Sequence, residues 1–583
     1  MTFDTDVAII GSGFGGAVAA LRFSEAGERV VVLERGAWIR RETFQPDLDF
    51  FWKPDRNAFG MHDFQFPGER IFAWLSSGVG GGSNTFAATM KRCEDFSAYP
   101  PGFSVEAMQP YYERAEAMMC ATRYPDYPPY SDVRATQLLL RAEQVLRENH
   151  PDEIAEAGAL PLAISFAPRA GEPGAEFTNP HGARQRYADP RDQALLGGDI
   201  DSKNSLDRNY LYLAQQHGAE IRDLHEVTSI DRESAGYRLK YRVRAADRTR
   251  WQRWRRRWLP WKGPPNWTEG QLTARRLVVS AGALGSTRLL LANRTNIETG
   301  PHVGTRYSTN GDYITFMIDF RALWVCWLAF AIGLVAVLLG AWGVALGASA
   351  FYYGGLIYSQ RAMDPDLGNT NSDHIQFHGH RRQPVYALIE GGRYPTPGKW
   401  LIAMLVSMLG LYRPDRYRLI SRGVNLLRDW IPPFGAIART WPIPLLTMGR
   451  DAAYGEMSLR DRELWIDFDV AANADYYRYC DRIGRLVAKA SRSYFLPNVL
   501  FKWTHRLQVP HNLGGVPMGV DRDHGVVDGC GRVFGQPNLM VLDGSILPAA
   551  TGPNPSLTIL AVSERAMDQV IAQLRSDGEI LAD

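Results

Sequence analysis

Two polar residues near the end of the chain have types and surroundings that fit proton transfer. His511 precedes the Gly-Gly pair of the run HNLGGVPMG, and Asn554 stands between two prolines in ATGPNPSL. A histidine near its reference pKa of about 6.5 is partly neutral at working pH and can accept a proton, and an asparagine can orient a substrate oxygen. The alternatives are a histidine satisfied within the core and an asparagine that caps a helix. We therefore take His511 and Asn554 as candidate catalytic residues.

At the other end of the chain, a glycine pattern indicates a dinucleotide site. The apolar run Val7–Ile10 precedes Gly11, Gly13 and Gly16 in G-x-G-x-x-G spacing, and an alanine-rich helix and a second strand ending in Glu34 follow. The first glycines allow a tight turn and close approach of a pyrophosphate, and the third lets helix and strand pack closely. The terminal acid can accept hydrogen bonds from ribose hydroxyls. An ordinary tight βαβ turn is the alternative, but the complete order of elements favours a dinucleotide.

Length and composition bound the remaining possibilities. A chain of 583 residues is too long for one core, so we expect two domains. The net charge of +2 argues against a dedicated nucleic-acid partner, and the scattered cysteines give no metal signal and suit a reducing compartment. Because the first strand begins by residue 6 or 7, we expect no signal peptide and a cytoplasmic nucleotide domain.

A charge-free stretch at 322–360 is unusual for a globular domain. A spanning helix needs about 20 apolar residues, so the stretch fits two short helices joined near Gly340–Gly343. Both flanks must return to one soluble domain, which favours a hairpin. Gly343 and Gly347 give a G-x-x-x-G face for close helix packing, and flanking arginines fit two cytoplasmic ends.

Two further segments point to a lipid bilayer as a partner. Residues 400–412 are apolar but too short to span, which suits an interfacial helix, and 248–267 alternate arginine with tryptophan. A hydrophobic lid or a dimer interface is the alternative for the apolar segments, and a nucleic-acid patch is the alternative for 248–267. We expect attachment at the cytoplasmic face of the cell membrane.

Together the two ends of the chain resemble the glucose–methanol–choline (GMC) oxidoreductases, which bind FAD, and they are similar to the bacterial cholesterol oxidase branch. Four more segments carry the resemblance: GVGGGSNTFAA (78–88), DSKNSLDRNYL (201–211), LVVSAGALGSTRLLLAN (277–293) and VGTRYSTNGD (303–312). The family has an asparagine three residues after the serine of the GGGS run. Here Phe86 stands at that position, and Asn84 lies closer to the serine.

The resemblance implies an α/β fold with a discontinuous, Rossmann-like FAD-binding domain at 1–95, 196–299 and 506–583. An α+β substrate domain with a mainly antiparallel sheet takes 96–195 and 300–505 and carries the inserted hydrophobic helical hairpin at 322–360. The residue patterns agree with this division. Strands are expected within 219–245 and at Leu539–Asp543, a strand, turn and helix over 276–293, and helices over 105–120 and 473–492.

The resemblance also implies which residues contact FAD. They are Gly11, Gly13, Phe14, Gly15, Gly16, Glu34, Gly80, Gly81, Gly82, Ser83, Asn84, Val227, Ala281, Gly282, Asp543, Gly544, Asn554 and Pro555. No histidine lies in the loop before GVGGGS, so we expect FAD to be bound non-covalently. A helix after Pro555 is expected to direct its positive end toward the flavin.

A third candidate catalytic residue follows from the run ALIEGGRYP (387–395). It resembles the cholesterol oxidase segment in which an acid stands five residues before a proline, and this places Glu390 in the role of that acid. In sterol oxidases the acid moves a proton to isomerise a double bond after oxidation. A desolvated carboxylate has the raised pKa that this work requires. The alternative is a surface acid in a Gly-Gly turn.

These features predict an FAD-dependent enzyme that oxidises the hydroxyl of a hydrophobic alcohol by proton abstraction and hydride transfer to the flavin. A sterol or other polycyclic alcohol is the first substrate class, and a long-chain aliphatic alcohol is the second. Oxygen or a membrane quinone would accept the electrons. A flavin-dependent lyase or decarboxylase acting on a lipid, and a non-catalytic flavin-bound membrane scaffold, are the alternatives from other classes.

Overall fold

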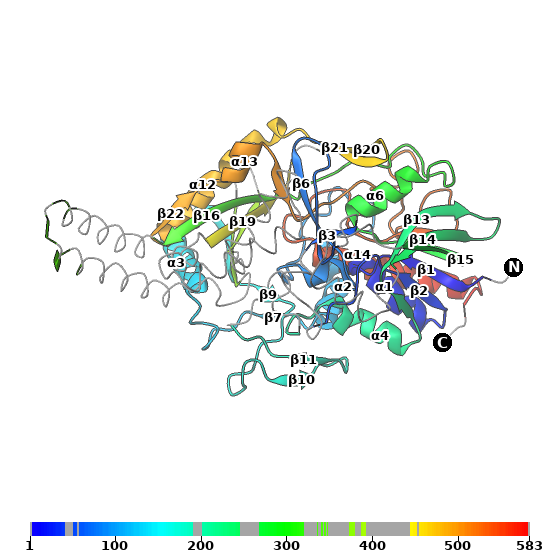
Figure 1. Ribbon diagram of the computed structural model, residues 1–583, viewed down its shortest axis with the longest axis horizontal. Helices are drawn as coiled ribbons and strands as arrows, with labels where there is room; N and C mark the ends of the chain where they lie inside the picture. Colours follow the sequence, from blue (N-terminus) through cyan, green and yellow to red (C-terminus); the bar gives the residue numbers. More distant parts are fainter. Residues whose placement is uncertain are drawn as a thin grey trace.

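Two β-sheets lie toward opposite ends of an elongated molecule (Figure 1). The computed structural model describes residues 3–40, 51–54, 58–190, 201–244, 267–319, 372–378, 386–391, 443–451 and 454–580, with a few single positions between 335 and 347. Apart from those positions, the predicted hairpin at 322–360 lies outside the described residues, as do 400–412 and 248–266. Within the described part of the chain, no helix has both the length and the hydropathy to cross a membrane.

The first sheet has seven strands in the order β12-β2-β1-β15-β14-β13, with β24 also paired to β15. Its strands are β1 (Thr5–Ile10), β2 (Val30–Leu33), β12 (Glu220–Arg222), β13 (His225–Arg232), β14 (Tyr237–Arg244), β15 (Trp267–Val279) and β24 (Leu539–Val541). The pairs of β12, β2, β1, β15 and β24 are parallel, whereas β13, β14 and β15 pair antiparallel. Strands β1 and β2 are buried on both faces, which explains their continuous apolar runs. The predicted strands at both ends of the chain are confirmed.

Helices cover this sheet and complete the first core. They are α1 (Phe14–Glu25), α2 (Val105–Met118), α4 (Tyr210–Gln216), α6 (Ala283–Ala292) and α14 (Ser556–Ser576). The small side chains of α1 from Ala17 to Ala20 are completely buried, so this helix packs closely on its neighbours. Helix α2 shares this core and packs against α14. The helix predicted over 105–120 is confirmed as α2. Its packing against α14 could not be read from its own amphipathic pattern.

The second sheet has six strands in the order β22-β16-β19-β18-β17-β8, and every pair is antiparallel. The strands are β8 (Ile154–Ala159), β16 (Tyr313–Asp319), β17 (Asp373–Phe377), β18 (Ala387–Gly391), β19 (Ile443–Gly449) and β22 (Ser493–Leu496). Helices α3 (Arg134–Asn149) and α12 (Ala474–Ala490) form a separate core with it. The amphipathic helix predicted over 473–492 is thus confirmed as α12.

Four strand ends of the second sheet lie together. Strand β16 ends at Asp319 and β17 begins at Asp373, while β18 ends at Gly391 and β19 begins at Ile443. Neighbouring strands among β16, β19, β18 and β17 run in opposite directions. These four strand ends therefore lie side by side at one end of the sheet. The chain therefore leaves the sheet and returns to it at this same end twice, between β16 and β17 and between β18 and β19.

The remaining elements connect the two halves. Strands β5 (His62–Gln65), β6 (Ile71–Ser76) and β23 (Leu507–Val509) form a three-stranded sheet, and β20 (Glu456–Arg460) pairs with β21 (Glu463–Asp467). Three further pairs are β3 (Trp52–Lys53) with β4 (Ala58–Phe59), β7 (Thr122–Arg123) with β9 (Pro161–Leu162), and β10 (Glu176–Thr178) with β11 (Arg184–Arg186). Helix α13 (Val499–Thr504) precedes β23, and short 3-10 helices include η2 (Gly81–Asn84), η4 (Leu206–Arg208) and η6 (Gly544–Ile546).

Candidate active site

A cavity of about 390 Å³ is lined from both halves of the molecule. The first sheet contributes the ends of β1 and β2 and Val227 of β13, while the second sheet contributes Ile314 of β16 and Leu446 of β19. His511, Asn554 and the start of α14 complete the wall. The volume falls within the range of about 300–1,000 Å³ that is usual for ligand and cofactor sites.

The glycines of the first loop have separate tasks. Gly11 has φ +94°, and a Cβ there would lie 2.2 Å from the carbonyl oxygen of Ser280. A Cβ on Gly16 would lie 2.2 Å from the carbonyl oxygen of Gly11, and one on Gly15 would lie 1.8 Å from that of Leu542. These three positions therefore accept no side chain because the backbone packs there. Gly15 and Gly16 support the loop and do not line the cavity.

Gly13 is different because its side-chain direction is empty. A Cβ on Gly13 would meet nothing within 4 Å, and Gly13 and Phe14 line the cavity immediately before the first turn of α1. Backbone N–H groups and the helix dipole at such a terminus stabilise a phosphate. The space next to Gly13 is thus suited to the pyrophosphate of a dinucleotide.

Glu34 stands at the end of β2 and lines the same cavity. One carboxylate oxygen accepts hydrogen bonds from the Ser12 N–H (3.1 Å) and the Ser12 hydroxyl (2.8 Å), and the other accepts from the Gly36 N–H (2.9 Å). These bonds fix the carboxylate at the strand end, and an ionised carboxylate has further lone pairs for a ribose hydroxyl.

The second glycine loop packs directly on the first. A Cβ on Gly81 would lie 2.8 Å from the Cα of Gly13, and Gly81 and Gly82 line the cavity. The Ser83 hydroxyl donates to the Gly80 carbonyl (2.7 Å) and accepts from the Leu206 N–H (3.0 Å). Gly80 and Ser83 therefore hold this loop in place and do not line the cavity.

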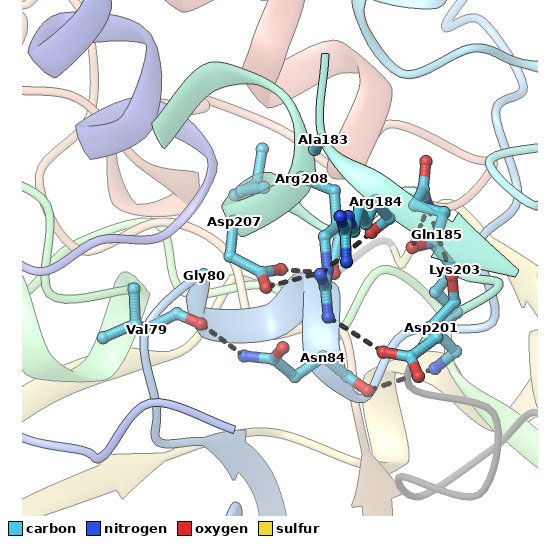
Figure 2. A network of polar contacts seen from close by, with 12 residues as sticks. Val79, Gly80, Asn84, Ala183, Arg184, Gln185, Asp201, Lys203, Asp207 and Arg208 are labelled. Carbon is cyan, nitrogen blue, oxygen red and sulfur yellow. Dashed lines mark hydrogen bonds and ion pairs between the residues drawn. The ribbon is translucent and has the colours of Figure 1, made fainter. Parts of the chain in front are cut away.

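A network of polar contacts holds the second glycine loop in place (Figure 2). The Asn84 side chain donates to the Val79 carbonyl (2.9 Å), and the buried Lys203 ammonium donates to the carbonyls of Asn84 (3.1 Å) and Phe86 (2.9 Å). Asn84 is thus a loop-stabilising residue, whereas Phe86 lines the cavity and packs on Phe14. The departure from the family pattern at Phe86 puts an aromatic ring in the cavity wall.

Asp543 joins two more segments of the cavity wall. Its carboxylate accepts hydrogen bonds from the Gly282 N–H (3.0 Å), the Ser286 hydroxyl and the Ser545 N–H (2.8 Å). Burial raises the pKa of Asp543 above its ordinary value, and these hydrogen bonds oppose the rise. Of the predicted contacts in this region, those that line the cavity are Val227, Ala281, Gly282, Asp543, Gly544, Asn554 and Pro555.

These observations together test whether the cavity suits FAD. A Cβ would have open space at Gly13 and at Gly282, Glu34 lies at the position for a ribose, and α1 and α14 both begin at the wall. The residues that line the cavity therefore fit a flavin dinucleotide, while Gly15, Gly16, Gly80, Ser83 and Asn84 hold the surrounding loops. His511 and Asn554 line the same cavity as Glu34, so bound FAD would share it with these two polar side chains.

His511 is held by a carboxylate that the sequence patterns had not assigned a role. The Asp312 carboxylate accepts hydrogen bonds from the His511 backbone N–H (2.9 Å) and from ring Nδ1 (2.8 Å). Burial lowers the pKa of His511, but the charge and hydrogen bond of Asp312, with the charge of Glu390, outweigh it and raise that pKa. Since Nδ1 is engaged and His511 lines the cavity, Nε2 is the ring nitrogen available to a ligand.

Glu390 lies on β18 and is completely buried. Its carboxylate accepts hydrogen bonds from the Asn554 amide (3.4 Å) and the Thr89 hydroxyl (3.3 Å). Burial raises the pKa of Glu390 to about 7, while the charge of His511 and these hydrogen bonds lower it in part. The alternative of a surface acid in a Gly-Gly turn is wrong.

Asn554 does not serve as a helix cap. Helix α14 begins at Ser556, with Pro555 at the cap position and no side-chain cap bond. The Asn554 amide nitrogen donates to Glu390, whereas its buried Oδ1 has no hydrogen-bond partner among the described residues. A buried acceptor left in this state is costly unless a ligand donates to it.

The structure thus brings His511, Asn554 and Glu390 to one place from three distant segments. Sequence patterns missed Asp312, Asn310 and Thr89, which hold them. Asp312 and Asn310 lie at the end of the run VGTRYSTNGD, one of the segments that resemble the family. An acid in a run shared with the family was the signal available for Asp312. Thr89 carried no signal of its own.

The fold and the cavity define an FAD-dependent oxidoreductase, because the cavity suits a flavin dinucleotide and is also lined by His511 and Asn554. The family comparisons agree. A model of the FAD binding domain matches residues 6–44, and the GMC oxidoreductase model matches residues 467–563, which include His511 and Asn554. At both ends the chain is thus similar to the GMC oxidoreductases, which use FAD.

Individual proteins align over nearly the whole chain. A cholesterol oxidase of Acinetobacter baumannii is 25% identical over 601 residues, covering 98% of this chain and 95% of the relative. A cholesterol oxidase of Mycobacterium tuberculosis is 26% identical over 619 residues, covering 97% and 90%. The crystal structure of pyridoxine 4-oxidase from Mesorbium loti superposes with a TM-score of 0.56 at 14% identity, covering 97% of this chain and 99% of that chain. This last likeness supports the fold alone.

Proposed function

We propose that this protein is a membrane-associated FAD enzyme that oxidises the hydroxyl of a hydrophobic alcohol, with a sterol-like alcohol as the first substrate class. One observation carries the proposal: a cavity that fits FAD is lined by an imidazole held by a carboxylate and by Asn554, whose amide contacts a buried carboxylate of raised pKa, Glu390. The relatives named cholesterol oxidase support the choice of substrate class.

The oxidation needs a proton acceptor and an orienting group. His511 takes the hydroxyl proton on Nε2, and the unpartnered Oδ1 of Asn554 fixes the hydroxyl in position. Bound FAD supplies the acceptor for the hydride that leaves the carbon bearing that hydroxyl. Asp312 keeps the imidazolium close to a negative charge once the proton has moved.

Glu390 gives the site a second proton-transfer step. A carboxyl group with a pKa of about 7 is present in both forms near neutral pH, so it can accept a proton and return it. On a sterol ketone, it removes a proton from the carbon between the carbonyl and the double bond. Returning that proton to the far end of the double bond moves the double bond into conjugation. Double-bond isomerisation is therefore part of the proposal for sterol substrates.

The remainder of the cavity wall supports an apolar substrate. Ile314, Pro444 and Leu446 of the second sheet line it, together with Leu464 of β21 and Phe86. A long-chain aliphatic alcohol would also fit such a wall, and it is the second substrate class. Either class partitions into bilayers, so contact with a membrane would assist delivery.

Membrane association rests on the apolar stretch at 322–360 and on where its flanks lie. Strand β16 ends and strand β17 begins at the same end of the second sheet. Glu390 on β18 lies one residue from that end. The described positions Val335, Leu338 and Val344 are 53%, 77% and 55% exposed, although all three are apolar. A lipid surface at the cytoplasmic face would cover such residues.

The test of substrate is anaerobic bleaching of the flavin by a panel of sterols and fatty alcohols. Bleaching by sterols supports the first class, and bleaching by fatty alcohols alone moves the assignment to the second. If no alcohol bleaches the flavin, the proposal fails and a lyase or decarboxylase acting on a lipid becomes the candidate. Oxygen or a quinone analogue is then added to the reduced enzyme. Whichever of the two restores the yellow colour is the electron acceptor.

A further inference from the structure

Five buried residues immediately before β16, Ser308–Asp312, contact both loops that carry the proton-transfer groups. The segment is anchored by Asp451, whose carboxylate accepts hydrogen bonds from the Ser308 hydroxyl (2.6 Å), the Thr309 N–H (2.7 Å) and the Thr309 hydroxyl (3.0 Å). The backbone at Gly311 is fixed as well, because its carbonyl accepts from the Tyr476 hydroxyl (2.7 Å). The segment is therefore a rigid support.

One end of the segment holds His511. Asp312 is completely buried, and its two carboxylate oxygens serve the backbone N–H and the ring Nδ1 of His511. A carboxylate oxygen accepts but does not donate, so this geometry fixes the proton of the neutral ring on Nδ1. The lone pair then lies on Nε2, the nitrogen available to the cavity.

The middle of the segment holds the loop that carries Asn554. The Asn310 side-chain oxygen accepts from the N–H of Thr551 (2.9 Å), the hydroxyl of Thr551 (3.1 Å) and the N–H of Gly552 (3.2 Å). Its amide nitrogen donates to the carbonyl of Pro553 (3.0 Å), the residue next to Asn554. Every polar atom of the Asn310 side chain is thus directed at three consecutive residues of this loop.

We propose that Ser308–Asp312 is a positioning segment of the active site, in which Asp312 sets the tautomer and base strength of His511 and Asn310 sets the place of Asn554. The proposal rests on the proposed oxidation of an alcohol, because that reaction gives His511 and Asn554 their roles. Asp312 and Asn310 act through these two residues and do not themselves contact a substrate.

A purely structural role explains Asp312 poorly. Burying a carboxylate costs several kcal/mol even with a good partner, and a neutral side chain could satisfy one backbone N–H at lower cost. The charge matters for the ring. The carboxylates that act on His511 are Asp312 and Glu390, whereas Asp451 is bonded to Ser308 and Thr309 and interacts with the charge of Asp312. Of these, Asp312 alone is bonded to the imidazole in the described structure.

The test reads the ring directly and needs no substrate. Holoenzyme labelled with ¹⁵N-histidine is titrated by NMR, and the His511 signals are assigned by their loss in His511→Asn. Wild type should show the neutral tautomer with the proton on Nδ1. In Asp312→Asn, the amide oxygen accepts from the His511 backbone N–H, which turns the amide nitrogen toward ring Nδ1. Because that nitrogen donates, Nδ1 becomes an acceptor and the ring proton should move to Nε2. The pKa of His511 should fall as well. Asp451→Asn removes a buried carboxylate that contacts the segment but not His511, and it should leave the tautomer unchanged.

Flavin reduction provides the second readout. Asp312→Asn should slow reduction by alcohol by about 10²–10⁴-fold with KM changed only a few-fold, because Nε2 can no longer accept a proton. Asp312→Glu should recover part of the rate. Asn310→Ser should slow reduction while the His511 tautomer stays that of wild type. FAD content and melting temperature show that each variant is folded.

Two results would overturn the proposal. An unchanged tautomer and titration in Asp312→Asn would remove Asp312 from control of the base, and a wild-type reduction rate in Asn310→Ser would remove Asn310. If no alcohol reduces even the wild-type flavin, the proposed function fails, and the NMR titration still decides the role of Asp312 independently.

Discussion

Replacing Glu390 by glutamine should stabilise the protein at alkaline pH and leave its stability near pH 4 almost unchanged. Burial raises the pKa of this carboxyl from 4.5 to about 7 in the folded protein. The folded state therefore binds the proton more tightly than the unfolded chain does. Folding stability falls as pH rises from about 4.5 to about 7, and it levels off outside that window. Glutamine cannot ionise, so Glu390→Gln does not pay this penalty.

The size of the effect follows from the width of the window. A shift of about 2.5 pKa units corresponds to about 3 kcal/mol, of which about 2.5 kcal/mol falls between pH 5 and pH 8. Full burial of Glu390 means that solvent does not screen this difference. With an unfolding entropy of about 2.1 cal/mol/K per residue, the melting temperature of a chain this long should shift by about 2 °C.

The assay is thermal unfolding of the holoenzyme, followed by circular dichroism, at several pH values from 5 to 8. The quantity of interest is the melting temperature of Glu390→Gln minus that of wild type, because other titrating groups cancel in this difference. Glu156→Gln is the matched control. His374 and Lys91 lower the pKa of Glu156 to about 2, so the stability that its ionised form contributes is lost only below pH 5. The melting temperature of Glu156→Gln minus that of wild type should therefore stay constant from pH 5 to 8. A flat difference for Glu390→Gln, or one that falls with pH, would refute the reasoning.

Three further outcomes are expected. Gly13→Val should fold but be purified without colour, because its Cβ enters the open space of the pyrophosphate site. Gly16→Val should fail to fold, because its Cβ meets the Gly11 carbonyl. Full FAD content in Gly13→Val would remove the dinucleotide assignment. His511→Ala should keep its FAD and be reduced by alcohol about 10²–10⁴-fold more slowly in stopped-flow experiments, and an unchanged rate would exclude it as the base. Replacing 322–360 by a short Gly/Ser link should give a protein that binds FAD without detergent and oxidises detergent-dispersed alcohol better than bilayer-embedded alcohol. The intact protein should stay with membranes after a high-salt wash, and its recovery in the soluble fraction as a monodisperse species would identify the stretch as a lid or an oligomer interface.

Much of the nucleotide half could be predicted from local sequence. The order of β1, the glycines, α1, β2 and Glu34 is confirmed, and so are the strand and helix over 276–293. These elements are short-range units whose hydrophobic periods and glycine positions specify their own conformation. The helix predicted over 105–120 is confirmed as α2, but its packing partner could not be predicted. Its contact with α14 joins residues more than 400 positions apart and leaves no local pattern.

The site shows the same division more sharply. The sequence by itself determined that a histidine and an asparagine stand in loops shaped by Gly and Pro, that an acid precedes Gly391, and that a dinucleotide site opens the chain. These features depend on the residue types and their neighbours in the chain. Their family resemblance gave them roles.

Only the tertiary structure decided what those residues experience. The pKa of Glu390 depends on its complete burial, and the base strength of His511 depends on a carboxylate 199 positions away. The open space at Gly13 differs from the crowded space at Gly16, although both glycines belong to one motif. Desolvation, the distance between charges and free volume are properties of the whole packed chain, so the sequence could name the candidate groups but could not set their chemistry.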